Sequence, residues 1–177
     1  GEGWWGHLHG TQDMVAGIAE YARLANKPEW VAWAKRVYDW IGRTQTMRCG
    51  WNADCVGSRT CESCTIASRF RLGLALYRAG AADPFPELDR FTRNQLMENQ
   101  FGDLSFVKPL KPETPRTPQK CYRDVDRMIL GGFQCWAMAN DLIGNPGIEG
   151  CGPAGGTQAL YFAWRNAVEW KNGELWI

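Results

Sequence analysis

The spacing of apolar residues in the first quarter of the chain predicts two amphipathic helices. In residues 11–26, apolar side chains recur every three or four positions, as they do on one face of a helix. Pro28 then suits the first turn of a second helix over residues 28–45. Because the connection is so short, we expect an antiparallel helical hairpin. The expected buried stripes are Met14, Ile18, Ala22 and Ala25, and then Trp30, Trp33, Val37, Trp40 and Ile41.

The helical period returns later in the chain, so the predicted fold class is all-α. Residues 47–59 have no period and are expected to form a loop. Residues 102–120 hold four prolines and predict a longer irregular loop. Further helices are expected at residues 60–80, 86–100, 129–142 and 157–170. About six helices in three hairpins would supply about half of an (α/α)6 toroid, and a solenoid of helix pairs is the structural alternative.

Composition and charge narrow the class of partner. The 177 residues, 45% of them hydrophobic, suffice for one globular domain with its own core. Lys and Arg number 20 and Asp and Glu 19, a net charge of +1, so we expect neither nucleic acid nor an anionic membrane as partner. No apolar run approaches the roughly 18 residues of a transmembrane helix. The ten Trp either fill a helical core or line a groove in which rings stack on sugars.

The cysteines and the chain ends leave the cellular compartment open. Seven Cys are an odd number, so at least one thiol stays unpaired even under oxidising conditions. A domain of this size does not need disulfides for stability. The last residues, GELWI, have the pattern of a turn followed by the start of a strand. We therefore expect the chain to be a piece of a longer protein.

The segment TCESCTIAS, residues 60–68, places a carboxylate and two thiols at a predicted helix start. Thr60 could cap the helix, and Glu62 suits the positive end of its dipole. The same position would lower the pKa of the Cys64 thiol and favour the thiolate, which is both a metal ligand and a nucleophile. Cys151 lies in a glycine-rich turn before another helix and has the same two possible roles. A capped helix with inert buried thiols, a metal site and a catalytic site all remain open.

Two other segments carry candidate polar chemistry. In GWNADCVG, Asp54 follows Trp51 closely, and an apolar neighbour can raise the pKa of a carboxyl group into the range of a general acid. A solvated or capping role for Asp54 is the alternative. The only two histidines, His7 and His9, stand in GHLHG and could contact a substrate hydroxyl or a metal. One buried and one solvated histidine at a helix entrance is the competing interpretation.

Six motifs in series resemble one enzyme family. They are GHLHG, GWNADCVG, CESCTIAS, RNQLMENQ, GGFQCWAMANDL and GCGPAGGTQALYFAW, and they span most of the chain. The series resembles the β-L-arabinofuranosidase-like glycoside hydrolases, family 127 and its relatives. The resemblance implies the C-terminal half of an (α/α)6 catalytic domain in residues 1–172, and the start of a β-sandwich domain in residues 173–177. The implied partners are a carbohydrate substrate and the remainder of the same polypeptide.

The family resemblance also implies a mechanism and its residues. A retaining hydrolase of this kind uses a zinc-bound cysteine thiolate as nucleophile and a carboxylic acid as acid and base. Glu62, Cys64 and Cys151 match zinc ligands, and Cys151 also matches the nucleophile. Gly152 stands where the family has a further Cys, so Cys55, Cys61 or a water would have to complete the zinc site. The remaining matches are Asp54 as the acid and His7, His9, Trp51, Trp136 and Asp141 as substrate contacts.

Three other functions compete with a retaining glycosidase. A degenerate member would bind carbohydrate without turnover. Another (α/α)6 sugar enzyme, such as an epimerase or lyase, would use His9 or a tyrosine as base and need no metal. A helical scaffold for protein interactions would have no pocket at which Cys64 and Cys151 meet. The separation of these two sulfur atoms therefore discriminates between the hypotheses, because ligands of one zinc lie within about 4 Å of each other.

Overall fold

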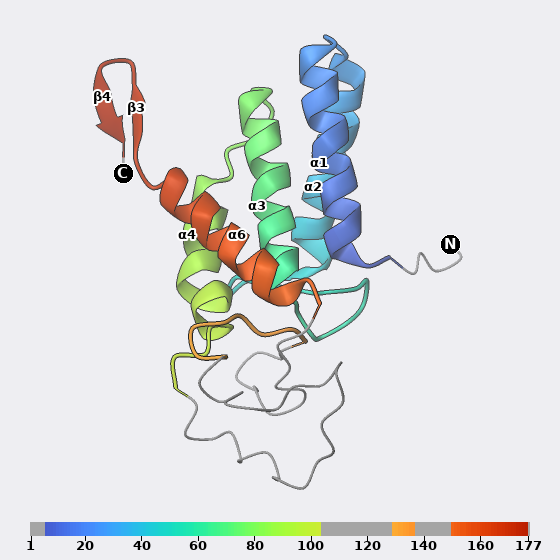
Figure 1. The fold of residues 1–177 in the computed structure, drawn as a ribbon. Coiled ribbons are helices and arrows are strands. Elements are labelled where there is room, and N and C mark those ends of the chain that lie inside the picture. The colour runs from blue at the N-terminus through green and yellow to red at the C-terminus, as the bar shows by residue number, and fades with distance from the viewer. Residues whose placement is uncertain (1–5, 104–128, 137–149, 177) are drawn as a thin grey trace, which may run out of the picture.

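A computed structural model describes residues 6–103, 129–136 and 150–176, apart from the side chains of Lys171 and Trp176. Helices dominate this part of the chain, so the mainly helical class is confirmed (Figure 1). The helices are α1 (Leu8–Leu24), α2 (Pro28–Thr44), α3 (Ser63–Arg78), α4 (Phe85–Phe91), the π-helix η1 (Thr92–Leu96) and α6 (Gly152–Arg165). The strands are β1 (Thr46–Met47), β2 (Trp51–Asn52), β3 (Glu169–Lys171) and β4 (Glu174–Trp176). None of the described helices is long and apolar enough to cross a membrane.

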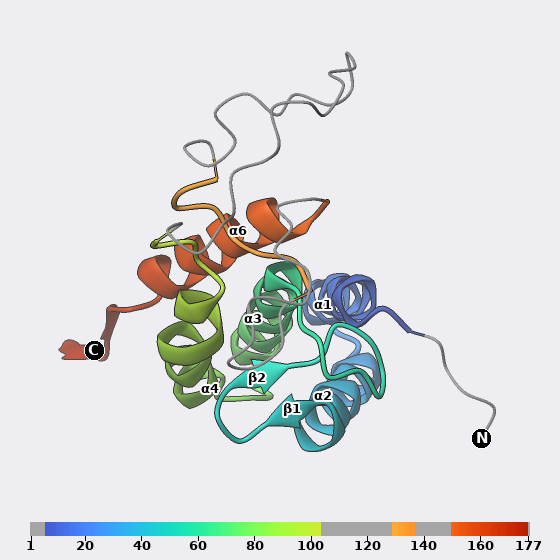
Figure 2. The ribbon, with the colours of Figure 1, turned by 90° about the horizontal axis from the view of Figure 1, so that it is seen from below.

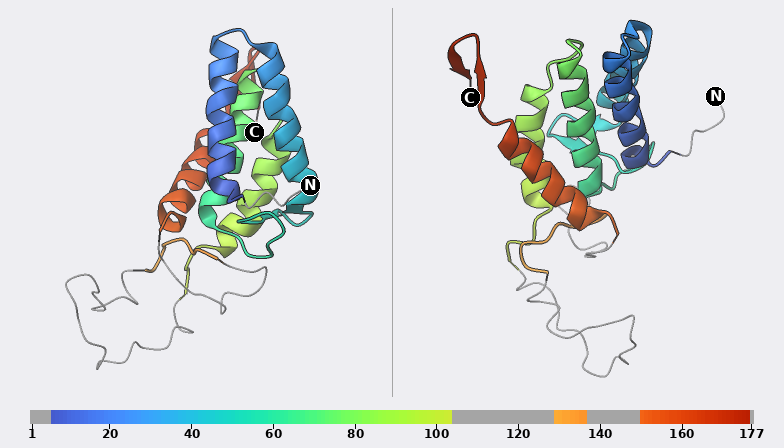
Figure 3. Two further views of the ribbon diagram at one scale, coloured as in Figure 1. Left: turned by 90° about the vertical axis from the view of Figure 1, so that its right-hand side faces the viewer. Right: turned by 45° about the horizontal axis from the view of Figure 1, so that its top comes forward.

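Helices α1 and α2 form the expected antiparallel hairpin (Figure 3), but of the predicted apolar stripes only Ala22 and Ile41 are fully buried. Met14 is 54% exposed, and Trp30 and Trp33 are exposed as well. The buried face of α1 instead carries small and polar residues, because small side chains let α1 approach α3 closely. The buried residues are Leu8, Thr11, Gln12, Val15, Ala16, Ala19 and Ala22 in α1, and Ala34, Tyr38 and Ile41 in α2.

Helix α3 is the centre of the molecule. Its most extensive contacts are with α1 and with α6, and Figure 2 shows it enclosed by α1, α2, α4 and α6. One side of α3 packs Ile66 and Phe70 against Phe91 of α4. The other side packs Leu72 and Leu76 against α1 and α2. The start of α3, which carries the candidate thiol, is therefore fixed by a core on both sides.

The loop predicted at residues 47–59 contains a short antiparallel pair, β1 and β2. Gly50 turns the chain between them with a φ of +89°, a conformation that residues with a side chain rarely adopt. Gln95 of η1 fixes the pair in place, since its side-chain oxygen accepts from the Asn52 N–H at 2.9 Å and its amide donates to the Asn52 carbonyl at 3.3 Å. Contacts this distant in sequence leave no periodic signal.

Two expected helices differ from the structure. The helix expected at residues 157–170 begins five positions earlier, at Gly152, and ends at Arg165. The β3–β4 hairpin follows it, so the expected strand at the end of the chain is present and pairs with residues that were predicted to be helical. The helix expected at residues 129–142 is not formed over 129–136, where Phe133 instead makes a β-bridge with Gln100. Positive φ angles at Gly131 and Trp136 oppose a helix there, and the remainder of that range lies outside the described residues.

Candidate metal and thiol site

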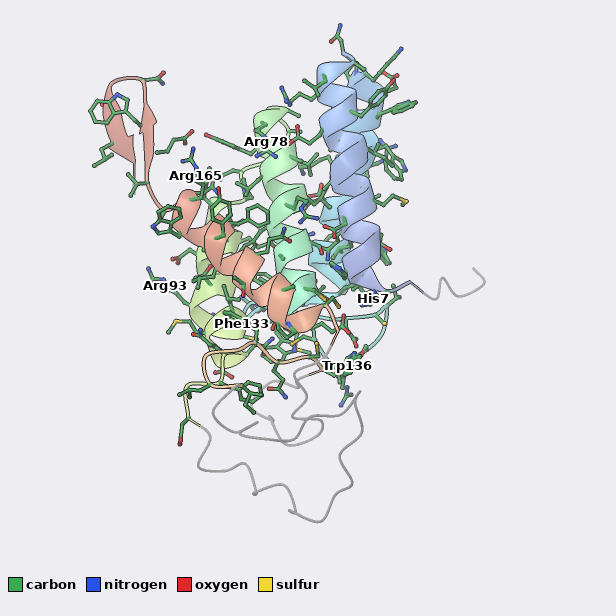
Figure 4. The ribbon with its side chains drawn as sticks, in the orientation of Figure 1. His7, Arg78, Arg93, Phe133, Trp136 and Arg165 are labelled. Atoms are coloured by element: carbon green, nitrogen blue, oxygen red, sulfur yellow. The ribbon has the colours of Figure 1, made fainter. Side chains whose placement is uncertain are left out.

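The N-terminal ends of α1, α3 and α6 meet at one end of the molecule (Figure 1). Each end brings side chains that can bind a metal: His7 and His9 from α1, Glu62 and Cys64 from α3, and Cys151 from α6. Three helix N-termini also direct their positive dipole ends toward this region, which favours negative charge there. Figure 4 shows His7 and Trp136 near this end of the molecule.

The two predicted thiols are in contact. The Sγ atoms of Cys64 and Cys151 lie 3.0 Å apart, which is longer than the roughly 2.05 Å of a disulfide bond. Cys64 is fully buried, whereas Cys151 is half-buried. The pair therefore presents one inner sulfur and one that solvent or a ligand can approach.

Glu62 joins the thiols to a histidine. Its Oε2 atom lies 3.2 Å from the Cys64 sulfur, 4.0 Å from the Cys151 sulfur and 2.5 Å from Nε2 of His7. Glu62 occupies the N-cap position of α3, but its side chain makes no capping hydrogen bond. Helix capping therefore does not explain this carboxylate, because it faces the sulfurs and the imidazole.

Glycines in the first turns of α6 permit the thiol contact. A Cβ atom on Gly155 would lie 2.2 Å from Cα of Cys64, closer than real atoms approach. A Cβ on Gly152 would lie 2.0 Å from Sγ of Cys135. The helix can therefore approach α3 only because these positions lack side chains. The glycine-rich segment GCGPAGG, which resembled a turn in the sequence, is in large part the helix start that brings Cys151 to Cys64.

The surroundings of Cys64 overturn the expected effect of the helix N-terminus on its pKa. Burial raises the pKa of the Cys64 thiol, and the hydrogen bond to Cys151 and the carboxylate of Glu62 act in the same direction. The cost of an unpaired buried charge exceeds the favourable helix dipole. In the metal-free site Cys64 is consequently a thiol at neutral pH, and a cation must offset the charge before it ionises.

Two overlapping groups of three donor atoms could each hold a metal. His9, Cys64 and Cys151 each offer one atom within 4.8 Å of the other two, and His7, Glu62 and Cys64 form a second such group. The two groups share the Cys64 sulfur, and Oε2 of Glu62 also lies 4.0 Å from the Cys151 sulfur, so the groups are adjacent. Sulfur, imidazole and carboxylate together form a typical ligand set for zinc.

His9 is held by residues that sequence analysis did not single out. Its Nδ1 lies 2.5 Å from Oγ of Ser68 and 3.6 Å from Oδ2 of Asp13. Ser68 stands one helical turn after Cys64, and Asp13 one turn after His9. The i,i+4 spacing was the available signal, since such residues share a helix face, but the helix predicted over residues 11–26 did not include His9. It became informative only once the two helices were known to be neighbours.

Asp54 is buried and engaged within its own loop. Its Oδ1 accepts from the Cys55 N–H at 2.7 Å, and its Oδ2 accepts from the Thr60 hydroxyl at 2.9 Å. Thr60 therefore anchors Asp54 and does not cap α3. These bonds give Asp54 a structural role in the loop, and an acid role for it stays a prediction.

The other expected contacts and ligands lie elsewhere or are unplaced. Trp51 is only 4% exposed and packs on Cys61, which makes it a core residue of this loop. Trp136 is half-buried at the edge of the described segment, and Asp141 lies outside the described residues. Cys61 is fully buried and bonded to Asn99, with burial raising its pKa to about 12, and neither it nor Cys55 belongs to the donor groups.

Comparison of the chain with protein-family models, with curated proteins and with solved structures finds no match. The site therefore has to be interpreted from its own geometry and chemistry.

Proposed function

We propose that the chain binds zinc at the thiol site and belongs to a retaining glycoside hydrolase in which Cys151 is the nucleophile. The single observation that supports this most strongly is the 3.0 Å contact between the Cys64 and Cys151 sulfurs beside Glu62. An inert pair of core thiols would gain nothing from a buried carboxylate in contact with it, since that carboxylate raises the cost of ionising Cys64. A bound cation would offset the negative charge of the carboxylate and of the ionised thiols, and so explains why these groups lie together.

The donor set fits zinc in kind and in spacing. Two thiolates on a tetrahedral zinc lie about 3.8 Å apart, from Zn–S bonds of about 2.3 Å, so the sulfurs would separate by less than about 1 Å on binding. Glu62 Oε2 is already near both sulfurs. A zinc ion held by Glu62, Cys64 and Cys151 would keep the thiols ionised at neutral pH.

The roles of the protein groups follow from their exposure and from the family resemblance. Cys151 is the more accessible sulfur, so it attacks the anomeric carbon; a C–S bond forms as the C–O bond to the leaving group breaks. Asp54 gives its proton to the leaving oxygen and then takes one from a water, whose oxygen bonds to the anomeric carbon as the C–S bond breaks and the thiolate is released. Cys64 and Glu62 stay in place and position Cys151. The substrate class implied by the resemblance is a furanoside, and the helical hairpins are proposed as part of an (α/α)6 toroid.

The test combines metal content with turnover. The wild-type chain, in its longest available form, is assayed for bound zinc and for hydrolysis of an aryl β-L-arabinofuranoside. Cys151→Ala should abolish hydrolysis, and Glu62→Ala should lower zinc content. Cys49→Ala is the matched control, because Cys49 is an exposed thiol. Full activity in Cys151→Ala would eliminate the thiolate mechanism.

A second candidate is a carbohydrate-binding protein without turnover. It is favoured by the engagement of both Asp54 oxygens within their own loop, which leaves the proposed acid less able to reach a substrate. Sugar binding with bound zinc but without hydrolysis would decide for this candidate.

A further inference from the structure

The proposed zinc site still has one coordination position without a protein ligand. The family resemblance accounts for Glu62, Cys64 and Cys151, and Gly152 stands where a further cysteine is expected. The resemblance implies four protein ligands, and zinc is typically bound in tetrahedral geometry. We propose that His9 is the fourth ligand, so that the site is built from one carboxylate, two thiolates and one imidazole. This inference rests on the proposed zinc function and specifies how this chain completes the site.

His9 lies close to both thiols. A ring nitrogen of His9 lies within 4.8 Å of the sulfurs of both Cys64 and Cys151. His9 is in the first turn of α1, whose N-terminal end meets those of α3 and α6. Ligands of one zinc lie within about 4 Å of each other, so one ion held by the two sulfurs can also reach this nitrogen after side-chain movements of about 1 Å. Glu62 and His9 do not belong to the same group of close donors, so binding of both to one ion requires a further movement of side chains.

The contact with Ser68 favours one tautomer of the His9 imidazole. The Ser68 hydroxyl donates its only hydrogen to the Cys64 carbonyl at 2.8 Å. With its hydrogen assigned to this carbonyl, the hydroxyl accepts from Nδ1 of His9 at 2.5 Å, and the nearby carboxylate of Asp13 also favours a proton on Nδ1. Nε2 is then left with a free lone pair, the form in which histidine binds a metal. Ser68 stands one turn after Cys64 in α3, so the helix that carries one ligand also orients the other.

The carboxylate of Asp13 lies behind His9. Oδ2 of Asp13 lies 3.6 Å from Nδ1 of His9, and its Oδ1 accepts from Arg71 at 2.5 Å. Arg71 also donates to Gln158 of α6 at 2.6 Å. A chain of polar contacts thus ties α1, α3 and α6 together behind the imidazole. Outer-shell carboxylates of this kind fix the ring of a ligating histidine and increase its basicity.

The two alternatives to His9 are less suited to the position. Nε2 of His7 is bonded to Glu62 at 2.5 Å, so His7 orients the carboxylate, and its side chain is 44% exposed. Cys135 places its sulfur against Gly152 and so fills the space of the missing side chain, but it belongs to neither group of mutually close donors. His9 is the candidate that faces both sulfurs.

The test uses X-ray absorption at the zinc edge and competition titration with a zinc chelator. The wild-type zinc complex should show two sulfur neighbours and the outer scattering of one imidazole. His9→Ala should remove the imidazole signal and raise the Kd for zinc by more than about 100-fold, beyond the usual outer-shell loss. His7→Ala is the matched control, and should keep the imidazole signal and raise the Kd by about 10-fold. His9→Gln, which keeps a polar side chain, serves if His9→Ala fails to fold.

The other possible results of these measurements each reject a different claim: the role of His9, the zinc function or the hydrolase. Three sulfur neighbours in the wild type, or loss of zinc on Cys135→Ser with full binding in His9→Ala, would assign the position to Cys135 and reject His9. An imidazole signal that survives in His9→Ala and disappears in His7→Ala would assign it to His7. A wild type that binds no zinc would reject the proposed zinc function and this inference together. Tight zinc binding through His9 without glycoside hydrolysis would reject the hydrolase alone.

Discussion

Cys64 and Cys151 are 87 positions apart in the sequence, and their sulfur atoms are 3.0 Å apart in the structure. The contact joins the first turn of α3 to the residue before α6, so it depends on how closely these two helices pack. Stability and metal binding are therefore expected to change together when the packing is altered.

Metal removal should lower the stability of the folded chain. A ligand that binds only the folded state adds about 2.7 kcal/mol when its free concentration is about 100 times its Kd. We expect thermal unfolding to shift to lower temperature when a chelator is added to the zinc-loaded protein. The shift should be absent in a Cys64→Ala, Cys151→Ala double variant, which has lost both sulfurs; an equal chelator effect in that variant would contradict the site.

Gly155→Ala should move α6 away from α3. The new methyl group would overlap Cα of Cys64, and overpacking of this kind costs about 1–3 kcal/mol. Zinc affinity should fall as well, because Cys151 moves with the helix. Gly17→Ala is the matched control: Gly17 lies within α1 with no atom near a new Cβ, so this change should stabilise the chain by about 0.5–1 kcal/mol. Urea unfolding of both variants checks the pair.

Arg69→Met should be strongly destabilising. Arg69 is 2% exposed, bonds both carboxylate oxygens of Glu87 at 3.0 Å and stacks on the ring of Tyr38. Its removal leaves Glu87 without its cation, and the loss of one partner of a buried pair costs about 3–5 kcal/mol. The control is Arg93→Met, which breaks an exposed pair with Asp89 and should change the free energy of unfolding by less than about 0.5 kcal/mol. Equal effects of the two substitutions would refute the buried-network argument.

Tyr38 should make stability fall at alkaline pH. Burial raises the pKa of its phenol above the ordinary value of 10.0, Glu87 and Asp39 act in the same direction, and Arg69 opposes them. The unfolded chain releases this proton above about pH 10 while the folded chain retains it. The associated stability is therefore fully present below pH 10 and is lost above it, by up to about 1.4 kcal/mol per pH unit. Urea unfolding between pH 9 and pH 11, as a function of pH, measures this slope.

The matched variant for that measurement is Tyr38→Phe, which should lose stability less steeply above pH 10 than the wild type. Tyr21→Phe should keep the wild-type slope, because Tyr21 is 57% exposed. Buried thiols such as Cys61 also release protons in this range on unfolding, but they contribute equally to all three proteins. Parallel slopes in the wild type and Tyr38→Phe would contradict the buried phenol.

Asp54→Asn should separate a loop role from an acid role. Loss of charge weakens the bonds from Cys55 and Thr60, and we expect a loss of about 1–2 kcal/mol in the free energy of unfolding. If Asp54 is also the acid, hydrolysis of a furanoside with a poor leaving group should fall far more than hydrolysis of one with an activated leaving group. Thr60→Val is the control, since it disturbs the loop but keeps the carboxylate. The same rate loss in both variants would leave Asp54 with the loop role only.

Sequence and structure agree where the signal is local. The hairpin of α1 and α2 follows from Pro28 and the helical period, and its bounds were predicted closely. The buried faces were predicted only in part: Ala22 and Ile41 are buried, but α1 also packs through Ala16 and Ala19, and small residues carry little weight in an apolar pattern. The helix expected at 129–142 failed over its described part because apolar residues there pack as an irregular segment, with Phe133 against Gly156.

The candidate site also divides into features that the sequence predicts and features that only the tertiary structure determines. That Glu62, Cys64, Cys151, His7 and His9 are metal-binding residue types, placed near helix starts, could be read from the chain alone. That they meet, that burial raises the pKa of the Cys64 thiol, and that His9 lies against Ser68 was decided by the packing of α1 and α6 on α3. The physical reason is range: helix periodicity and capping act over a few residues, whereas burial and donor spacing depend on atoms brought together from distant parts of the chain.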